Sequence, residues 1–141
     1  MTIKNKKWIL KERPMGLVKD SDFELISEEL PKINEGEILI ENIYLSFDPT
    51  QRSWLNDVPG YLPPVQIGEV VRSGGIGRII DSKNPDYKNG DLTFGLVGWQ
   101  THCLTKPNAE DRFRVVPDIL PMPTMLNVMG STGITAYYGL V

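Results

Sequence analysis

Histidine and cysteine are almost missing from this sequence, because its 141 residues contain one of each, the neighbours His102 and Cys103. A catalytic zinc ion needs about three protein ligands drawn from cysteine, histidine and carboxylate side chains. Adjacent residues on a strand point to opposite faces, so these two cannot easily share one ion. We therefore predict no metal site. A lone cysteine also excludes an internal disulfide and fits a reducing compartment.

The same scarcity limits nucleophilic catalysis. Ser–His and Cys–His pairs are excluded except through His102 itself. The simpler interpretation makes His102 a strand residue with a surface hydrogen bond and Cys103 a small apolar strand residue. The sequence alone therefore identifies no catalytic residue.

Excess positive charge is also lacking, with 15 basic residues against 18 acidic ones. Nucleic acids and anionic membranes bind proteins through basic patches, so we expect neither as a partner. The first residues are too polar for a signal peptide, and no apolar run is long enough for a membrane span. We predict a cytoplasmic protein.

Short apolar runs separated by turn residues make up most of the chain, whose length suits about one domain. The segment 37–45 divides into two alternating sides, a period of two that is typical of a strand. Glu37, Leu39, Glu41 and Ile43 lie on one side, and Ile38, Ile40, Asn42 and Tyr44 lie on the other. Such spacing predicts a mainly β fold, an antiparallel barrel or sandwich. The predicted strands are residues 7–10, 23–30, 37–45, 67–71, 76–82, 92–97, 101–105 and 113–116.

The last segment, residues 126–141, has little charge and lacks a helix stop signal. We interpret it as the opening of a buried helix, so either more chain should follow or a partner should cover it. The predicted division is a domain over residues 1–120 and a linker with the first helix of a further domain over residues 121–141.

A strand that runs into Asp48 and Pro49 forms the most informative local pattern. Asp48 suits a helix N-cap, and proline is favoured at the first helical position. This pattern fits either a capped helical turn or a cleft lined by Pro49, Thr50 and Arg52. The proline-rich segment 54–65 follows and predicts a long surface loop.

The sequence resembles the leukotriene B4 dehydrogenase and prostaglandin reductase family, to which plant alkenal reductases and bacterial curcumin reductases are similar. Its motifs occur in the family's order over nearly the whole chain. They lie at residues 42–52, 61–70, 84–91, 95–99 and 130–139.

The resemblance implies a GroES-like antiparallel β-barrel with short helices, followed by a Rossmann domain. It also implies zinc-independent hydride transfer from NADPH to the β-carbon of an enal, enone or quinone. The positions matching Pro49, Thr50 and Thr135 are expected near the cofactor. Arg52 and Tyr61 are expected at the substrate, with Arg52 bracing the turn.

Departures from the family pattern leave alternatives open. Thr50 stands where plant relatives have a tyrosine, and Ser131 and Thr132 replace a Met-Pro pair, serving either as helix cap or as cofactor contacts. No strand leads into a glycine-rich turn and a helix, so the missing nucleotide-binding domain would have to supply the pyrophosphate site. The alternative function is a non-catalytic binding module, with a homodimer as a possible assembly.

Overall fold

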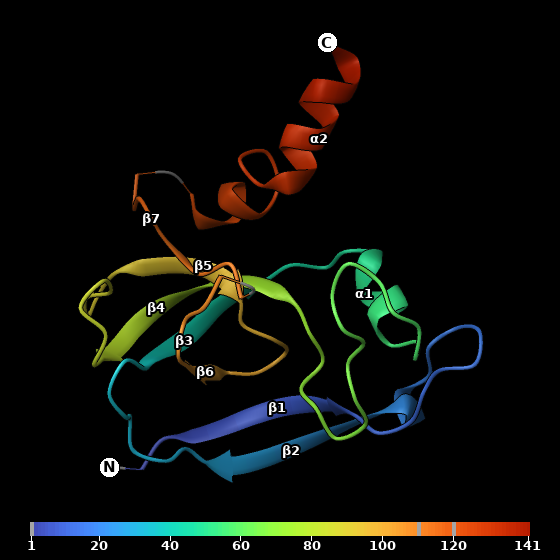
Figure 1. The fold of residues 1–141 in the computed structure, drawn as a ribbon, viewed down its shortest axis with the longest axis horizontal. Coiled ribbons are helices and arrows are strands. Elements are labelled where there is room, and N and C mark those ends of the chain that lie inside the picture. Colours follow the sequence, from blue (N-terminus) through green and yellow to red (C-terminus); the bar gives the residue numbers. More distant parts are fainter. Residues whose placement is uncertain (1, 110, 120) are drawn as a thin grey trace.

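The computed structural model describes residues 2–109, 111–119 and 121–141, and it is mainly β, as the sequence predicts. The strands are β1 (Lys4–Leu10), β2 (Phe23–Glu29), β3 (Ile38–Leu45), β4 (Gly74–Ser82), β5 (Leu92–Leu96), β6 (His102–Thr105) and β7 (Arg114–Val116). The helices are α1 (Thr50–Trp54) and α2 (Ser131–Leu140), with short 3-10 helices η1 (Asp20–Asp22) and η2 (Met122–Leu126). The α2 helix projects away from the strands, as Figure 1 shows.

Within the described residues the strands form two antiparallel sheets. One pairs β1 with β2, and the other has the order β6-β3-β4-β5-β7. The β3–β4 register shifts twice, and such bulges increase the local bend and twist of a sheet. Gly75 lies at this bend, where a Cβ atom would be 2.7 Å from the Tyr44 carbonyl oxygen, so only glycine fits without movement. Gly74 and Gly75 also belong to β4, which therefore begins two residues before the strand predicted over residues 76–82.

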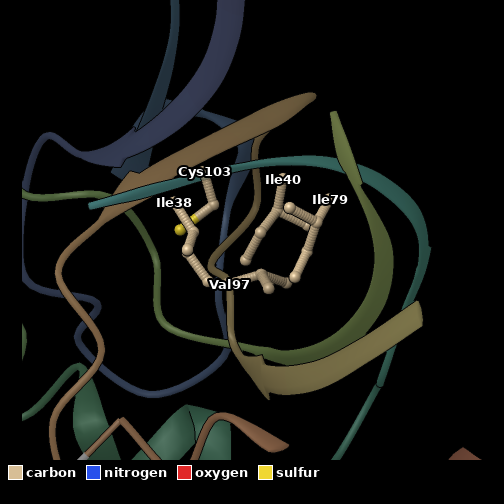
Figure 2. Close-up of a cluster of buried hydrophobic side chains, with 5 residues drawn as sticks. All are labelled: Ile38, Ile40, Ile79, Val97 and Cys103. Atoms are coloured by element: carbon tan, nitrogen blue, oxygen red, sulfur yellow. The ribbon is translucent and has the colours of Figure 1, made fainter. Parts of the chain in front are cut away.

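One hydrophobic core lies inside the larger sheet and consists of Ile38, Ile40, Ile79, Val97 and Cys103 (Figure 2). The alternation in β3 explains how Ile38 and Ile40 reach it from the same face. Burial, with a smaller contribution from the negative charge of Asp111, raises the pKa of the Cys103 thiol to about 12. Cys103 is therefore a packed, protonated strand residue.

A second core connects the smaller sheet to α1. Leu10 of β1 packs there with Leu55, Val65 and Val71, and partly buried aromatic rings surround this cluster. The guanidinium of Arg13 donates hydrogen bonds to the carbonyl oxygens of Leu55 at 2.8 Å and Val65 at 3.0 Å. These bonds join residues 55 and 65, which lie near the two ends of the loop predicted over residues 54–65.

The first strand is joined to residues near position 100. The backbone N–H of Trp8 donates to the Trp99 carbonyl at 2.8 Å, and that of Thr101 donates to the Lys6 carbonyl at 2.8 Å. Asn5 is 1% exposed, and its amide donates to the Gln100 side chain at 2.9 Å. These bonds hold β1 against the segment that leads into β6.

Residues 67–71 do not form the predicted strand. Only an isolated bridge between Ile9 and Val70 marks this stretch as β-like. Gly68 has φ +88°, in the left-handed region, and its N–H donates to the Leu10 carbonyl at 2.7 Å. A turn here replaces the extended run, which the apolar residues alone did not indicate.

The helix starts also differ from the predictions. The α1 helix begins at Thr50 after Pro49, and the carboxylate of Asp48 accepts a hydrogen bond from the Ser46 hydroxyl instead of capping the helix. At the C-terminal end, the helix expected from residue 126 begins at Ser131.

Gly130 is the N-cap of α2, so the interpretation of Ser131 and Thr132 as capping residues is wrong. The predicted domain boundary at residue 120 lies outside the described residues. Among the described helices, none is both long and apolar enough to cross a membrane.

Candidate functional site

A cavity of about 870 Å³ lies where the end of β3, the sheet and the C-terminal segment meet. Its walls come from the β3–α1 connection, from β4, β5 and β7, and from the first turns of α2. Four of the five residues that the sequence analysis assigned to a site line this cavity. They are Pro49, Thr50, Tyr61 and Thr135.

The cavity wall formed by residues 46–50 is held from behind by buried polar groups. The Gln51 amide donates to the Ser46 carbonyl at 2.7 Å, and the Ser73 hydroxyl donates to the same oxygen at 2.8 Å. Gln51 is 7% exposed and Ser73 is fully buried. Buried polar groups that satisfy one another stabilise a single arrangement, so this wall is well ordered.

Thr50 opens α1 at the cavity wall. Its carbonyl oxygen accepts a hydrogen bond from the Ser53 hydroxyl at 2.7 Å, whereas its own hydroxyl makes no hydrogen bond to any described residue. Pro49 precedes it with φ −56°, a backbone angle that suits the entry to a helix. The free hydroxyl of Thr50 is therefore available to a ligand in the cavity.

Arg52 lies in α1 but does not line the cavity. Its guanidinium donates to the carbonyl oxygens of Pro14 at 3.1 Å and Gly16 at 2.8 Å, and to the Asn56 side chain at 2.7 Å. These bonds brace the loop after β1 against α1. Substrate binding by Arg52 stays a prediction.

Tyr61 is 64% exposed and lies at the cavity edge, with its ring centroid 6.1 Å from that of Trp54. The Arg72 guanidinium lies 5.5 Å from the centre of the Trp54 ring and donates to the Pro63 carbonyl at 2.7 Å. Arg72 thus stabilises the cavity wall that contains Trp54 and Tyr61 through a cation–π contact and a hydrogen bond.

The first turns of α2 close the cavity from the C-terminal side. The Thr135 hydroxyl donates to the Ser131 carbonyl at 2.7 Å. A Cβ atom at Gly133 would collide with the backbone carbonyl of Val128, so this turn packs tightly on the preceding loop. Ser131 and Thr132 line the cavity beside Thr135.

Several residues at the cavity were not predicted from the sequence. Arg112 and Arg114 line the β7 side, and Arg114 extends over Phe94 with 5.1 Å between guanidinium and ring centre. Gln51 and Ser73 support the opposite wall. No sequence signal marked these four, because only the folded chain brings positions 51, 73, 112 and 114 to one place. The described residues contain no cluster of three metal-ligating side chains.

Comparisons with known proteins place this geometry in a family. A family model described as the N-terminal domain of oxidoreductase matches residues 6–114. The NADPH-dependent curcumin reductase of Escherichia coli (strain K12) is 35% identical over 138 residues, which cover 98% of this chain and 39% of that protein. Prostaglandin reductase 1 of Bos taurus is 34% identical, with 96% of this chain and 40% of that protein covered.

A solved structure agrees with these relatives. CurA from Vibrio vulnificus in complex with NADPH matches with a TM-score of 0.84 and 29% identity, covering 96% of this chain and 40% of that one. The chain thus spans about two-fifths of the length of the proteins that it matches.

Proposed function

The chain belongs to the family of oxidoreductase N-terminal domains found in zinc-independent medium-chain dehydrogenases and reductases, and we propose that it forms the substrate side of an NADPH-dependent alkene reductase. The proposed substrates are α,β-unsaturated aldehydes and ketones, or quinones. The observation that carries the proposal is the cavity of about 870 Å³ on which Pro49, Thr50, Tyr61 and Thr135 converge.

The cavity residues fit the nicotinamide end of NADPH. Hydroxyl groups of Thr50, Ser131 and Thr132 stand among apolar walls, which suits a flat ring with one polar carboxamide. The relatives include a protein whose name states NADPH dependence and a structure that contains NADPH. The pyrophosphate needs a glycine-rich turn after a strand, which this sequence does not contain, so residues outside positions 1–141 would hold it.

Bound NADPH would supply a hydride to the β-carbon of the substrate. This transfer leaves negative charge on the substrate oxygen, which a hydrogen-bond donor must stabilise. The Thr50 hydroxyl makes no bond to a described residue and is able to donate to that oxygen. Pro49 and Trp54 add apolar surface around the reacting carbons, and this surface excludes water and strengthens the donor's effect.

Turnover of the whole polypeptide tests the proposal. We would express the reading frame that contains this chain to its stop codon and follow the oxidation of NADPH with a panel of enals, enones and quinones. We expect turnover that persists after treatment with a metal chelator. A folded protein that oxidises NADPH with none of these compounds contradicts the proposal.

Exposed apolar residues on α2 favour one alternative, a binding module without catalysis. Tyr137 is 62% exposed and Leu140 is 89% exposed. Large apolar side chains gathered on an exposed helix are typical of an interaction surface. In that case α2 would mediate self-association, as in a homodimer. Sedimentation of the whole polypeptide, together with the absence of turnover, would support this alternative over the reductase.

A further inference from the structure

The six arginines of the chain divide into two groups by their partners. Each of the first four donates a hydrogen bond to a backbone carbonyl oxygen elsewhere in the fold. These are Arg13 with Leu55, Arg52 with Pro14, Arg72 with Pro63 and Arg78 with Gly90. Arg112 and Arg114 form no hydrogen bond through their guanidinium groups and no ion pair with any described residue.

The two unpaired arginines share one location, since both line the cavity of the proposed active site. Arg114 belongs to β7, and its guanidinium lies 5.1 Å from the centre of the Phe94 ring. Stacking on an aromatic face leaves the N–H donors at the edge of the guanidinium free. A planar cation held in this way is suited to bind a carboxylate or a phosphate.

Arg112 has an unusual backbone. Its φ of 56° lies in the left-handed region, and it is the one non-glycine residue with positive φ among the described residues. This conformation costs a non-glycine residue free energy and is frequent at functional sites. In Arg112 it accompanies a side chain that lines the cavity and bonds to no oxygen atom of a described residue.

The lining of the cavity contains one acidic side chain among the described residues. Asp48 is the carboxylate that lines the cavity within the described chain, and it is bonded to Ser46 beside α1. Figure 1 shows β7 and α1 on different sides of the base of α2. The cavity therefore has hydroxyl and apolar groups and the Asp48 carboxylate at its α1 end, and at its β7 end two cations that pair with no described residue.

We propose that Arg112 and Arg114 form an anion-binding subsite for a carboxylate at the far end of the substrate. This inference rests on the proposed function and narrows it to enals and enones that carry a carboxylate, with the double bond lying near Thr50. A phosphate of NADPH has the same anionic oxygen chemistry and is the other source that the experiment must distinguish.

The experiment compares one enone that ends in a carboxylate with its methyl ester. Both are assayed with the wild-type polypeptide, encoded to its stop codon, and with Arg112→Gln, Arg114→Gln and Arg78→Gln. Arg78 lies outside the cavity and pairs with Asp118, so Arg78→Gln is the control for the loss of one positive charge. The melting temperature of each variant establishes that it folds.

Loss of a charge-assisted hydrogen bond predicts that Arg112→Gln and Arg114→Gln each lower kcat/KM for the acid by about tenfold or more. In these two variants, kcat/KM for the ester and the KM for NADPH should change by less than about twofold. In Arg78→Gln, kcat/KM for the acid should also change by less than about twofold. If the ratio of kcat/KM for the acid to kcat/KM for the ester is the same in wild type and in both variants, the subsite is overturned. A raised KM for NADPH with an unchanged ratio also overturns it and assigns the arginines to the cofactor.

A binding measurement separates this inference from the proposed function. If the wild-type polypeptide reduces neither the acid nor the ester, the proposed function fails. Calorimetry with the saturated keto acid, which has no double bond to reduce, then decides about the subsite. Weaker binding to Arg112→Gln than to Arg78→Gln supports the subsite, and equal binding to both overturns it.

Discussion

The β-rich body, residues 4–116, and α2 differ in how many buried side chains they contain. Both hydrophobic cores lie in the body, whereas no side chain of α2 is buried, and Ile134 is 51% exposed. The strands of the body place apolar residues on the face that packs, while α2 is apolar on several sides. The body thus contains both buried clusters, whereas α2 gains little from packing against the described residues.

The largest expected contrast comes from truncating one isoleucine in each region. Ile40 is fully buried in the first core, and Ile40→Ala should lower the free energy of unfolding by about 3 kcal/mol through lost burial and a cavity. The matched change Ile134→Ala in α2 should cost less than about 0.5 kcal/mol. Urea denaturation of the chain measures both. Equal losses would mean that α2 packs as firmly as the body.

The buried thiol in the body offers a pH test of the same contrast. The pKa of Cys103 is raised from 9.0 to about 12, so the folded state keeps its proton where the unfolded state loses it. This stabilising contribution is complete below pH 9, and it is lost as the pH rises from 9 to about 12. Wild type should therefore lose more stability over this range than Cys103→Val.

A thiol on α2 is the control for this titration. Leu140 is 89% exposed, so Leu140→Cys in a Cys103→Val background should react with a thiol reagent at pH 9. Native wild-type Cys103 should stay unreactive at that pH. Fast labelling of Cys103 in folded protein, or parallel pH profiles for wild type and Cys103→Val, would contradict the burial effect.

Adding a methyl group to a glycine of β4 should weaken the body. A Cβ atom at Gly77 would lie 2.5 Å from the Glu41 carbonyl oxygen in the neighbouring strand. The strands would have to separate, so Gly77→Ala should cost about 2 kcal/mol in free energy of unfolding. Thermal and urea denaturation measure this loss, and unchanged stability would show that the sheet adjusts freely.

The smallest effect, of opposite sign, is expected for the same substitution in α2. No atom lies within 4 Å of a Cβ at Gly139, and alanine favours a helix more than glycine. Gly139→Ala should therefore raise helix content and stabilise α2 by at most about 1 kcal/mol. Circular dichroism tests this, and a loss of helicity would indicate an unseen close contact.

Much of the body was predictable because its signals are local. The period of two in β3 predicts a strand, and Ile38 and Ile40 on one side of it are fully buried. Leu39 on the other side is buried as well, which the alternation alone does not indicate. The stretch 67–71 was predicted wrongly because a left-handed Gly68 inside an apolar run changes its direction. Helix starts at Thr50 and Ser131 were missed because a capping signal does not reveal which hydrogen bond its side chain will make.

The candidate site was predictable only in part. Pro49, Thr50, Tyr61 and Thr135 followed from family resemblance, and all four line one cavity. Their supporting and charged neighbours depend on contacts between residues far apart in the chain. The Gln51–Ser73 bond crosses 22 positions, and nothing in the local sequence distinguishes Arg112 from an ordinary surface arginine.

The hydrogen bond between the side chains of Asn5 and Gln100 also affects how the chain folds during synthesis. The two residues are 95 positions apart, and Asn5 additionally accepts a hydrogen bond from the His102 N–H at 3.0 Å. A ribosome makes the N-terminal residues first. The bonds from Asn5 to Gln100 and His102 can therefore form only after about a hundred residues have left the exit tunnel. Contacts of such long range slow folding, and the nascent hairpin of β1 and β2 would be exposed to chaperones meanwhile.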